Sequence, residues 1–282
     1  MLKTRVLTAV VLLGVFLSAV FVLPPEGWVL AVTLTASLAA WEWGGLMAWG
    51  RSARIVLGVM FALVCALIWR LCPAVLGLGD DFAHQAWPFS RWIYLPALAF
   101  WVAVVPVWMS RRWRLPASLP GVLIGLLIIL PTWLALVQLR QAGDWALLAI
   151  MAAVWVADIG AYFVGRRFGR RKLAPSISPG KTWEGAFGAA VAVTCYVFGL
   201  APWLPSAMKL SPMLLALVAL SMTVVSILGD LFESLLKRNA GLKDSSGILP
   251  GHGGILDRID SQTSTLPLVA LIWLINLSAG AA

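Results

Sequence analysis

Residues 247–277 read GILPGHGGILDRIDSQTSTLPLVALIWLINL, a polar, glycine-rich segment that leads directly into an apolar run. Apolar runs of this kind recur throughout the 282 residues, of which 61% are hydrophobic and 12% charged. That charged fraction is about half the fraction found in an ordinary soluble domain. The sequence therefore indicates a membrane protein that places a polar segment between two apolar helices.

The length of the apolar runs indicates which kind of membrane protein this is. Many runs reach the roughly 20 residues that a helix needs to cross a bilayer, and the mean hydropathy is +0.92. A β-barrel would need segments of about 10 residues with alternating polarity, whereas the runs here are continuous. We therefore predict an all-α, polytopic integral membrane protein.

Nine membrane-crossing helices are expected. The first apolar run is taken as a retained helix, because no A-x-A-like cleavage site follows it. The cysteines Cys65, Cys72 and Cys195 lack metal-ligand spacing and are expected to be small buried hydrophobic residues. The predicted helices lie near residues 6–23, 28–49, 55–76, 92–109, 118–139, 145–164, 183–203, 211–236 and 264–280.

The basic residues predict the orientation of these helices. With the N-terminus in the cytoplasm, most lysines and arginines fall in cytoplasmic segments, as the positive-inside rule requires. The exceptions are Arg70, Arg91, Arg140 and Lys209. Nine helices then place the C-terminus outside, on the periplasmic side of a cell inner membrane. The net charge of +9 needs no nucleic-acid partner, because anionic lipid headgroups attract such basic segments.

The acidic residues of the second half gather on the predicted cytoplasmic side. A charge in or beside a membrane helix is costly and usually faces a cavity or has a function. Acids placed among many lysines and arginines suggest a site that handles a metal ion and an anionic substrate. These acids are Asp158, Glu184, Asp230, Glu233, Asp244, Asp257 and Asp260.

The first group of candidate site residues lies in VADIGAYFVGRRFGRRK, residues 156–172. Asp158 is a carboxylate within a predicted helix, and Gly160 and Gly165 would let another helix or a ligand approach closely. Alternatively, Asp158 pairs with a nearby arginine. The basic run either anchors the helix on the cytoplasmic side or forms a collar for lipid phosphate.

The second group is SISPGKTWEG, residues 176–185. We predict a turn at 178–180, with the next helix beginning at Lys181 or at the threonine after it. Exposed amides at a helix N-terminus beside a lysine would form a phosphate cradle. The segment is not a P-loop, because Pro175 replaces the first glycine of that pattern. The alternative is an ordinary helix start with Glu184 near its positive end.

The third group is GDLFESLLKRNAGLKDSSGILPGHGGILDRIDS, residues 229–261. Asp230, Glu233 and Lys237 are spaced i, i+3, i+7 and share one helix face with Ser234. The glycines that follow let backbone amides approach an anion without obstruction. Carboxylates on facing segments offer the hard oxygen ligands that Mg²⁺ prefers, with substrate phosphates and water completing its coordination.

In these motifs the chain closely resembles the phosphatidate cytidylyltransferase family, also called CDP-diglyceride synthases. The resemblance covers residues 158–261, while the N-terminal half is similar to the family mainly in hydropathy. The matching residues are Asp158, Ala161 and Tyr162; Ser178, Pro179, Lys181, Thr182, Glu184 and Gly185; and Ser234, Lys237, Arg238, Lys243, Asp244, Gly247, Leu249, Pro250, His252, Gly253, Gly254, Asp257, Arg258, Ile259 and Asp260.

The resemblance implies that CTP reacts with phosphatidate, a membrane lipid, to give CDP-diacylglycerol and pyrophosphate. It also implies a Mg²⁺-dependent nucleotidyltransferase of phospholipid biosynthesis, with K⁺ as a second cation, and a homodimer. The metal-binding aspartates of the family match Asp230 and Asp257 here. Because CTP is soluble and phosphatidate stays in the leaflet, we expect the site at the cytoplasmic ends of the last helices.

Individual roles are expected on this basis. Lys181 and the amides near Ser178 would hold the triphosphate, and Arg258 and Lys237 would neutralise phosphate charge. His252 either donates a proton or hydrogen bond to phosphate or is packed in its glycine turn. The full set comprises Lys181, Lys237, His252, Asp257 and Arg258 as catalytic residues; Asp158, Ser178, Lys181, Thr182, Glu184, Ser234, Arg238, Gly253 and Gly254 as substrate-binding residues; and Asp230, Asp257 and Asp260 as metal ligands.

The motifs also divide the chain into two regions. Residues 1–144 would form an N-terminal group of membrane helices. Residues 145–282 would form the catalytic membrane region, with cytoplasmic motif loops at 165–182 and 230–262. Glu42, within WEWGG, lies in the first region. A role in helix packing and a role in lipid access are both open for this buried acid.

Two other functions would explain part of this sequence. A CDP-alcohol phosphotransferase is also membrane-bound and Mg²⁺-dependent, but its aspartates are four residues apart, whereas Asp257 and Asp260 are three apart and no D-G-x-x-A-R occurs. A transporter would explain buried charges and broken helices. It predicts inverted repeats and charged residues near mid-span in both halves, whereas the acids here gather in one half.

Overall fold

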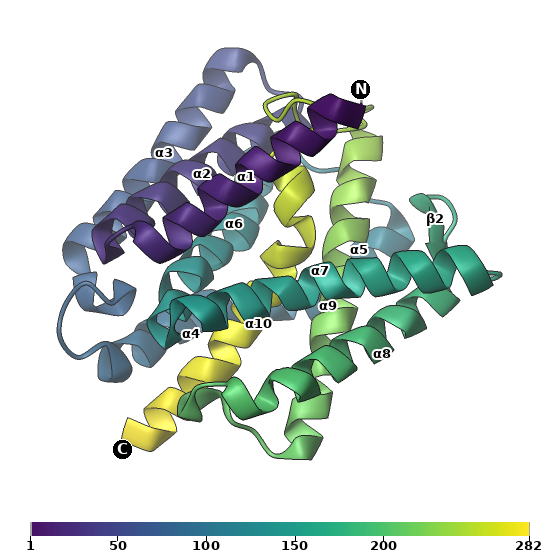
Figure 1. Cartoon of the computed structure of the whole chain (residues 1–282). Coiled ribbons are helices and arrows are strands. Elements are labelled where there is room, and N and C mark those ends of the chain that lie inside the picture. The colour runs from purple at the N-terminus through teal and green to yellow at the C-terminus, as the bar shows by residue number, and fades with distance from the viewer. Residues whose placement is uncertain (1, 282) are drawn as a thin grey trace.

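The computed structural model describes the backbone of residues 2–281 and the side chains of residues 6–206 and 208–280. Most of this part is helical (Figure 1). The helices are α1 (Leu2–Val22), α2 (Pro25–Leu46), α3 (Arg51–Leu71), α4 (Phe82–Ala99), the π-helical η2 (Phe100–Val104), α5 (Val105–Arg111), α6 (Leu119–Leu139), α7 (Asp144–Phe168), α8 (Trp183–Leu200), α9 (Pro212–Asn239) and α10 (Leu256–Ala281). Short 3₁₀ turns occupy some of the connections, namely η1 (Pro73–Leu76), η3 (Arg140–Ala142), η4 (Ala201–Trp203) and η5 (Ser206–Met208).

Within residues 2–281, every predicted membrane span falls on a helix. Eight helical segments are long and apolar enough to cross a membrane, and the apolar part of α1, Val6–Val22, is shorter. Helices are expected here, because a bilayer leaves backbone groups no partner outside the chain. The structure agrees with an all-α polytopic membrane protein. The count of nine crossings, the orientation and the division at residue 144 stay predictions.

The fourth predicted span begins earlier than expected. Predicted at 92–109, it belongs to one helical segment, Phe82–Arg111, made of α4, η2 and α5. The first turns of α4 contain several polar residues, which lowered their hydropathy. Ala86 and Ser90 are nevertheless fully buried, so packing against the rest of the molecule extends this helix.

The last helix begins at Leu256, eight residues before the predicted membrane span at 264–280. Its first half contains a run of buried polar residues, 261–265. Their hydroxyls find partners within the bundle. Ser264 Oγ donates to Val225 O at 2.7 Å, and Thr265 Oγ1 donates to Ser261 O at 2.8 Å. Because these hydroxyls have partners, the helix stays regular although this part of it is polar and buried.

A two-stranded antiparallel hairpin between α7 and α8 is an addition to the predicted all-α fold. β1 (Lys172–Ala174) pairs with β2 (Ser178–Thr182). Residues 178–180 thus lie in a strand, and the prediction of a turn there was wrong; the turn is at 175–177. Proline and glycine favour a turn locally, but pairing with the neighbouring strand overrides that preference. The following helix begins only at Trp183.

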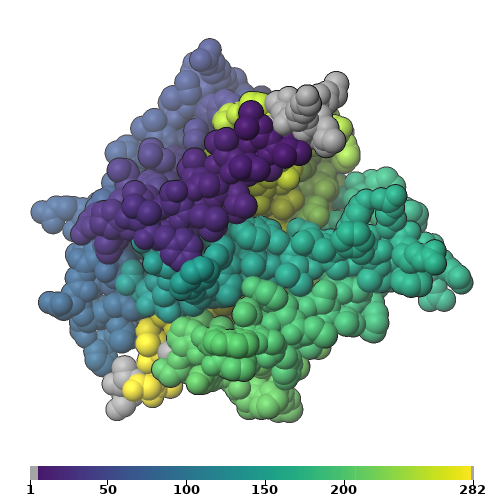
Figure 2. Space-filling model, viewed as in Figure 1, coloured from purple at the N-terminus to yellow at the C-terminus, as the bar shows by residue number. Residues whose placement is uncertain are grey.

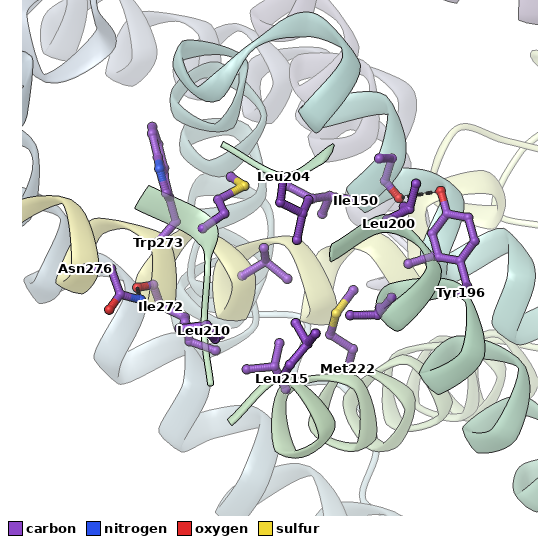
Figure 3. Close-up of a pocket in the computed structure, with 16 residues that line it drawn as sticks. Ile150, Tyr196, Leu200, Leu204, Leu210, Leu215, Met222, Ile272, Trp273 and Asn276 are labelled. Carbon is purple, nitrogen blue, oxygen red and sulfur yellow. Dashed lines mark hydrogen bonds between the residues drawn. The ribbon is translucent and has the colours of Figure 1, made fainter. Parts of the chain in front are cut away.

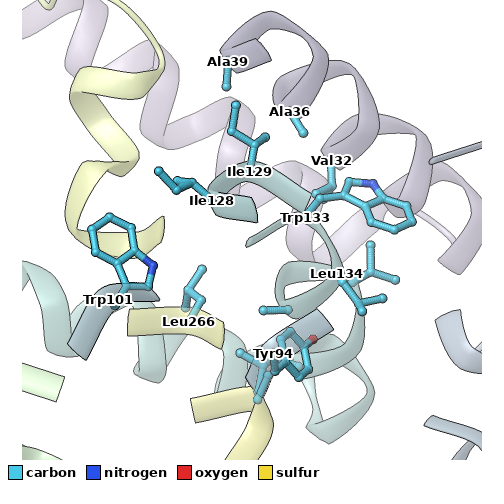
Figure 4. Packing of buried hydrophobic residues seen from close by; sticks show 14 of the residues in the cluster. Val32, Ala36, Ala39, Tyr94, Trp101, Ile128, Ile129, Trp133, Leu134 and Leu266 are labelled. Atoms are coloured by element: carbon cyan, nitrogen blue, oxygen red, sulfur yellow. The ribbon is translucent and has the colours of Figure 1, made fainter. Parts of the chain in front are cut away.

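The largest hydrophobic core includes side chains of α2, α6 and α10 (Figure 4). Trp133 of α6 is fully buried, and its Nε1 donates to Thr33 Oγ1 of α2 at 2.8 Å. Trp43 of α2 donates in turn to Gly121 O of α6 at 2.9 Å. The Nε1 atoms of these two buried tryptophans are therefore paired, and their hydrogen bonds join α2 to α6.

Helices α7 and α8 pack backbone against backbone. A Cβ atom added at Gly188 would lie 2.5 Å from Val164 Cβ, and one added at Gly160 would lie 2.8 Å from Ala192 Cβ. Small residues permit such close contact between membrane helices. The prediction that Gly160 allows close approach of another helix is confirmed, and that helix is α8.

The connection between α9 and α10, residues 240–255, contains the polar, glycine-rich segment that begins at Gly247. It lies at the molecular surface, at the same end as the start of α1 (Figures 1 and 2). The end of α10 lies at the opposite end of the molecule (Figure 1). The polar segment and the N-terminus thus occupy the same end, which fits the relative placement expected from the basic residues.

Candidate active site

A polar cavity of about 480 Å³ lies between α7, the hairpin, the start of α8 and α9. Predicted site residues from three of these elements line it, namely Asp158, Ser178, Lys181, Thr182 and Asp230. Ligand sites are typically concave and contain a few convergent polar groups. Because this cavity brings together acids and a lysine from distant parts of the chain, it is the candidate active site.

Lys181 and Asp230 form an ion pair across the cavity. Their side chains are 26% and 28% exposed, so both partners are open to solvent. Ser234 Oγ donates to Asp230 Oδ1 at 3.3 Å. Asp158 on α7 lies within electrostatic reach of both members of the pair. An incoming anion could therefore replace Asp230 at the lysine, and an incoming cation could replace Lys181 at the acid.

Two further residues of α7 line the same cavity, Tyr162 and Arg166. Arg166 Nη1 donates to Tyr162 Oη at 2.7 Å. No role was assigned to Arg166 individually, although it belongs to the predicted basic collar. The sequence could have revealed Arg166 as a cavity residue. Asp158, Tyr162 and Arg166 follow one another at intervals of four and so share a helix face.

Backbone amides at the start of α8 donate hydrogen bonds to other groups of the protein. Thr182 Oγ1 accepts from Gly185 N at 3.1 Å, as an N-cap residue does. Trp183 N donates to Arg171 O at 3.0 Å. These contacts fit the ordinary helix start that was the alternative to a phosphate cradle. Lys181 remains the cationic group that this segment presents to the cavity.

Glu184 stabilises the chain just before the hairpin. Its Oε2 accepts from Arg170 N at 3.0 Å and from Arg171 N at 3.2 Å. Glu184 does not line the cavity. Its predicted role in substrate binding stays a prediction, and the contacts described here are structural.

A second polar cluster, which we call the Asp257 cluster, surrounds the first turn of α10. Asp257 Oδ1 accepts from Lys237 Nζ at 2.5 Å, and Oδ2 accepts from Ser245 N at 2.7 Å and Gly254 N at 2.8 Å. Lys237 Nζ also lies 3.3 Å from Glu233 Oε1. Asp257 thus links α9, the connection and α10, which the i, i+3, i+7 spacing on α9 did not reveal.

Glu233 and Asp260 continue this cluster toward the cavity. Glu233 is 6% exposed, and neither of its carboxylate oxygens has a hydrogen-bond partner in the described residues, despite the ion-pair distance to Lys237. Asp260 lies within electrostatic reach of Glu233 and also of Asp230 and Asp158. The predicted metal ligand Asp260 does not line the cavity, but its carboxylate is close enough to influence acids of both the cavity and the Asp257 cluster.

The other predicted residues of the third motif are less enclosed. Arg258 and Arg238 are exposed, and Arg258 lies within electrostatic reach of Asp158. Arg238 does not line the cavity. Asp244 is exposed as well. Of these groups, the positions described here favour Arg258 as the one that could meet an anion in the cavity.

The glycine turn places His252 close to the Asp257 cluster. Leu249 N donates to Gly253 O at 2.9 Å, and His252 N donates to Leu249 O at 2.8 Å. Gly253 has a φ of +79°, and a Cβ there would lie 2.7 Å from Asp257 Oδ2. His252 Nδ1 is buried without a hydrogen-bond partner in the described part of the chain. Both predicted roles of this histidine remain open.

Glu42 of α2 contacts the same connection and was not assigned to the site by its sequence. It is fully buried, with 0% of its surface exposed, which argues against a lipid-facing role. Its carboxylate accepts hydrogen bonds from Ser246 and from the backbone at the start of α10. The predicted packing role therefore has a specific form, a contact between α2 and the segment that leads into α10.

A different, apolar pocket lies among α7, α8, α9 and α10 (Figure 3). It measures about 80 Å³, and its lining includes Leu215, Met222 and Ile272. Tyr196 at its edge donates to Ala149 O at 3.1 Å. The predicted site residues do not line this pocket. Its chemistry suits hydrocarbon, so the polar cavity is the better candidate for the reacting groups.

The sequence is similar to known cytidylyltransferases along most of its length. The model of the cytidylyltransferase family matches residues 3–275 of the chain. A phosphatidate cytidylyltransferase of Pseudomonas aeruginosa is 40% identical over 281 residues, with 97% of each chain covered. One of Haemophilus influenzae is 33% identical over 288 residues, covering 97% of this chain and 99% of its own. One of Bacillus subtilis is 44% identical over 138 residues, about half of each chain.

Proposed function

Because the chain belongs to the cytidylyltransferase family, we propose that it converts CTP and phosphatidate to CDP-diacylglycerol and pyrophosphate. The observation that carries the proposal is the Lys181–Asp230 pair facing Asp158 in a polar cavity among membrane helices. The names of the relatives at 40% and 33% identity supply the substrate pair.

The reaction needs positioning and charge neutralisation more than proton removal. A phosphate oxygen of phosphatidate, already anionic near neutral pH, attacks the α-phosphorus of CTP. A new P–O bond forms, the bond from that phosphorus to the α,β-bridging oxygen breaks, and pyrophosphate leaves with the electron pair. Catalysis of such transfers rests mostly on orientation and electrostatic stabilisation.

The cations of the cavity suit this task. Lys181 would bind the triphosphate after its ion pair with Asp230 opens. The solvent exposure of both side chains makes this exchange feasible. Arg258, which lies within electrostatic reach of Asp158, and Arg166, which lines the cavity, would add positive charge. Lys237, now held by Asp257 and Glu233, would keep the acids of α9 and α10 together.

The residues present fit a Mg²⁺ requirement. Within residues 6–206 and 208–280, no three His, Cys, Asp or Glu side chains converge closely enough to hold a metal by themselves. Mg²⁺ is commonly held by one or two carboxylates together with substrate phosphates, so Asp230 and Asp260 would suffice with CTP. Asp257, which lies beside Lys237, would supply a further carboxylate from the start of α10. When bound, Mg²⁺ would neutralise charge on the phosphates, with K⁺ proposed as a second cation.

The surroundings of the cavity support access from the lipid. The helices α7 and α8, which border the cavity, carry exposed aromatic side chains, among them Phe163, Trp183 and Phe187. Aromatic side chains pack favourably against acyl chains. Phosphatidate could therefore enter the cavity laterally from the bilayer, while CTP enters from water. We further propose that the cavity faces the cytoplasm, that the protein resides in the cell inner membrane, and that it works as a homodimer.

A labelling experiment tests the proposal. Purified protein is mixed with phosphatidate, Mg²⁺ and CTP labelled in the cytidine moiety, and the label is followed in the organic phase. We expect lipid-soluble label, with pyrophosphate released in equal amount. A transporter would instead take up label into liposomes without labelling lipid, and that result would reject the proposed reaction.

A further inference from the structure

Glu42 holds the segment that leads into α10. Its Oε1 accepts from Ser246 Oγ at 2.6 Å and from Ile255 N at 2.9 Å, and its Oε2 accepts from Leu256 N at 2.7 Å. Glu42 and Leu256 are 214 positions apart in the sequence. A fully buried carboxylate of α2 is thus the partner of the connection and of the first amides of α10.

Glu42 and Asp257 hold this segment from two sides. Ser245 Oγ lies 2.8 Å from Asp257 Oδ2 and 3.3 Å from Glu42 Oε2, and its single hydrogen serves one of them at a time. A Cβ at Gly254 would overlap both Ser245 Oγ and Glu42 Oε1. The backbone therefore passes between two carboxylates at a place where only glycine fits.

The contact also fixes the direction of α10. Ile255 N and Leu256 N belong to the start of the helix, where amides have no partner within the helix. A carboxylate there is favourable both as an acceptor and through the helix dipole. Arg54 lies within electrostatic reach of Glu42 and donates to Trp41 O at 3.2 Å, so a cation accompanies this buried acid.

We propose that Glu42 is a positioning residue for the reaction. It holds residues 245–256 so that Asp257, which follows directly in the chain, stays aligned with Lys237. Glu42 does not line the polar cavity, so it acts through these residues and not on substrate. In its kinetic part the proposal rests on the proposed function. It makes the N-terminal helices part of the catalytic unit.

The variant Glu42→Gln tests this role. Each carboxylate oxygen of Glu42 accepts one backbone N–H, so the amide NH₂ of glutamine must face one of them in either orientation. We expect kcat to fall by roughly 100-fold, as displacement of a catalytic group by about 1 Å can do. The KM for CTP should stay within about threefold of the wild-type value, because Lys181 and Asp230 lie on other elements. Glu42→Asp, which keeps the charge, should recover part of kcat.

Two control variants separate positioning from loss of stability. Glu26→Gln makes the same change at an exposed acid of α2 and should leave turnover unchanged. Gln138→Leu removes a buried network with Tyr94 and Ser90 far along the chain from the connection. It should lower the unfolding temperature while the folded protein keeps its kcat. An equal loss of kcat in Gln138→Leu would overturn the positioning role.

Hydrogen exchange gives a measurement that needs no substrate. In Glu42→Gln the amides of residues 245–256 should exchange at least about tenfold faster, because a lost hydrogen bond weakens local protection, while those of α6 keep their rates. Unchanged exchange in this segment, or normal kcat despite faster exchange, overturns the proposal. If wild-type protein formed no labelled lipid, the proposed function would fail, and the exchange rates would still decide whether Glu42 holds the segment.

Discussion

At the scale of single residues, Lys237 lies between the carboxylates of Asp257 and Glu233. Lys237→Met should lower the free energy of unfolding by about 3–5 kcal/mol, because two buried acids lose their cation. Thermal unfolding in detergent measures this, with Lys209→Met as the control at an exposed lysine. Equal unfolding temperatures for the two variants would contradict the structural role of Lys237.

Lys181, in contrast to Lys237, should affect turnover much more than stability. Its ion pair with Asp230 is partly exposed, so Lys181→Met should change the free energy of unfolding by no more than about 1 kcal/mol. The rate of CDP-diacylglycerol formation should fall by roughly 100-fold, because a cation that meets the phosphates is lost. Turnover equal to wild type would remove Lys181 from the proposed site.

Asp257→Asn tests the metal role of this acid. The substitution keeps the shape of the side chain but removes the charge. Turnover at saturating Mg²⁺ should drop by at least about 100-fold, measured as CTP-dependent lipid labelling in detergent. Near-normal turnover would show that Asp257 holds no essential metal and serves only the hydrogen bonds to Ser245 and Gly254.

At the scale of elements, the close contact of α7 and α8 shapes one wall of the cavity. Gly188→Val would push its new side chain into Val164 and should cost about 1–3 kcal/mol, as overpacking does. Because the cavity lies between these helices, turnover should fall as well. Gly199→Val on the same helix is the matched control, since nothing lies within 4 Å of its Cβ position. Equal behaviour of both variants would contradict this packing.

At the scale of the whole molecule, the predicted orientation places the α9–α10 connection and η5 on opposite sides of the membrane. In a variant lacking Cys65, Cys72 and Cys195, Leu242→Cys should react with a membrane-impermeant thiol reagent only in inverted vesicles. Ser206→Cys should react only in right-side-out vesicles. The reverse pattern would invert the topology, and labelling of both from one side would reject the nine-crossing arrangement.

The sequence by itself determined the membrane class, the approximate helices and several residues of the cavity, among them Asp158, Lys181 and Asp230. Helix formation in a bilayer depends on local hydropathy and on internal hydrogen bonding, both of which can be read along the chain. The motif residues Asp158, Lys181 and Asp230 were found because charges are rare in such a chain. Their meeting in one cavity was expected from the motifs and is seen in the structure.

Only the tertiary structure decided the partners of these residues. The strand at 178–180 needed its pairing with β1, and the burial of the polar residues 261–265 of α10 needed a bundle that offers partners to their hydroxyls. Lys237 meets Asp257, and Glu42 holds the start of α10, across 20 and 214 positions of sequence. Local pattern cannot predict such contacts, because they depend on how distant helices pack and on which buried charges must find a partner.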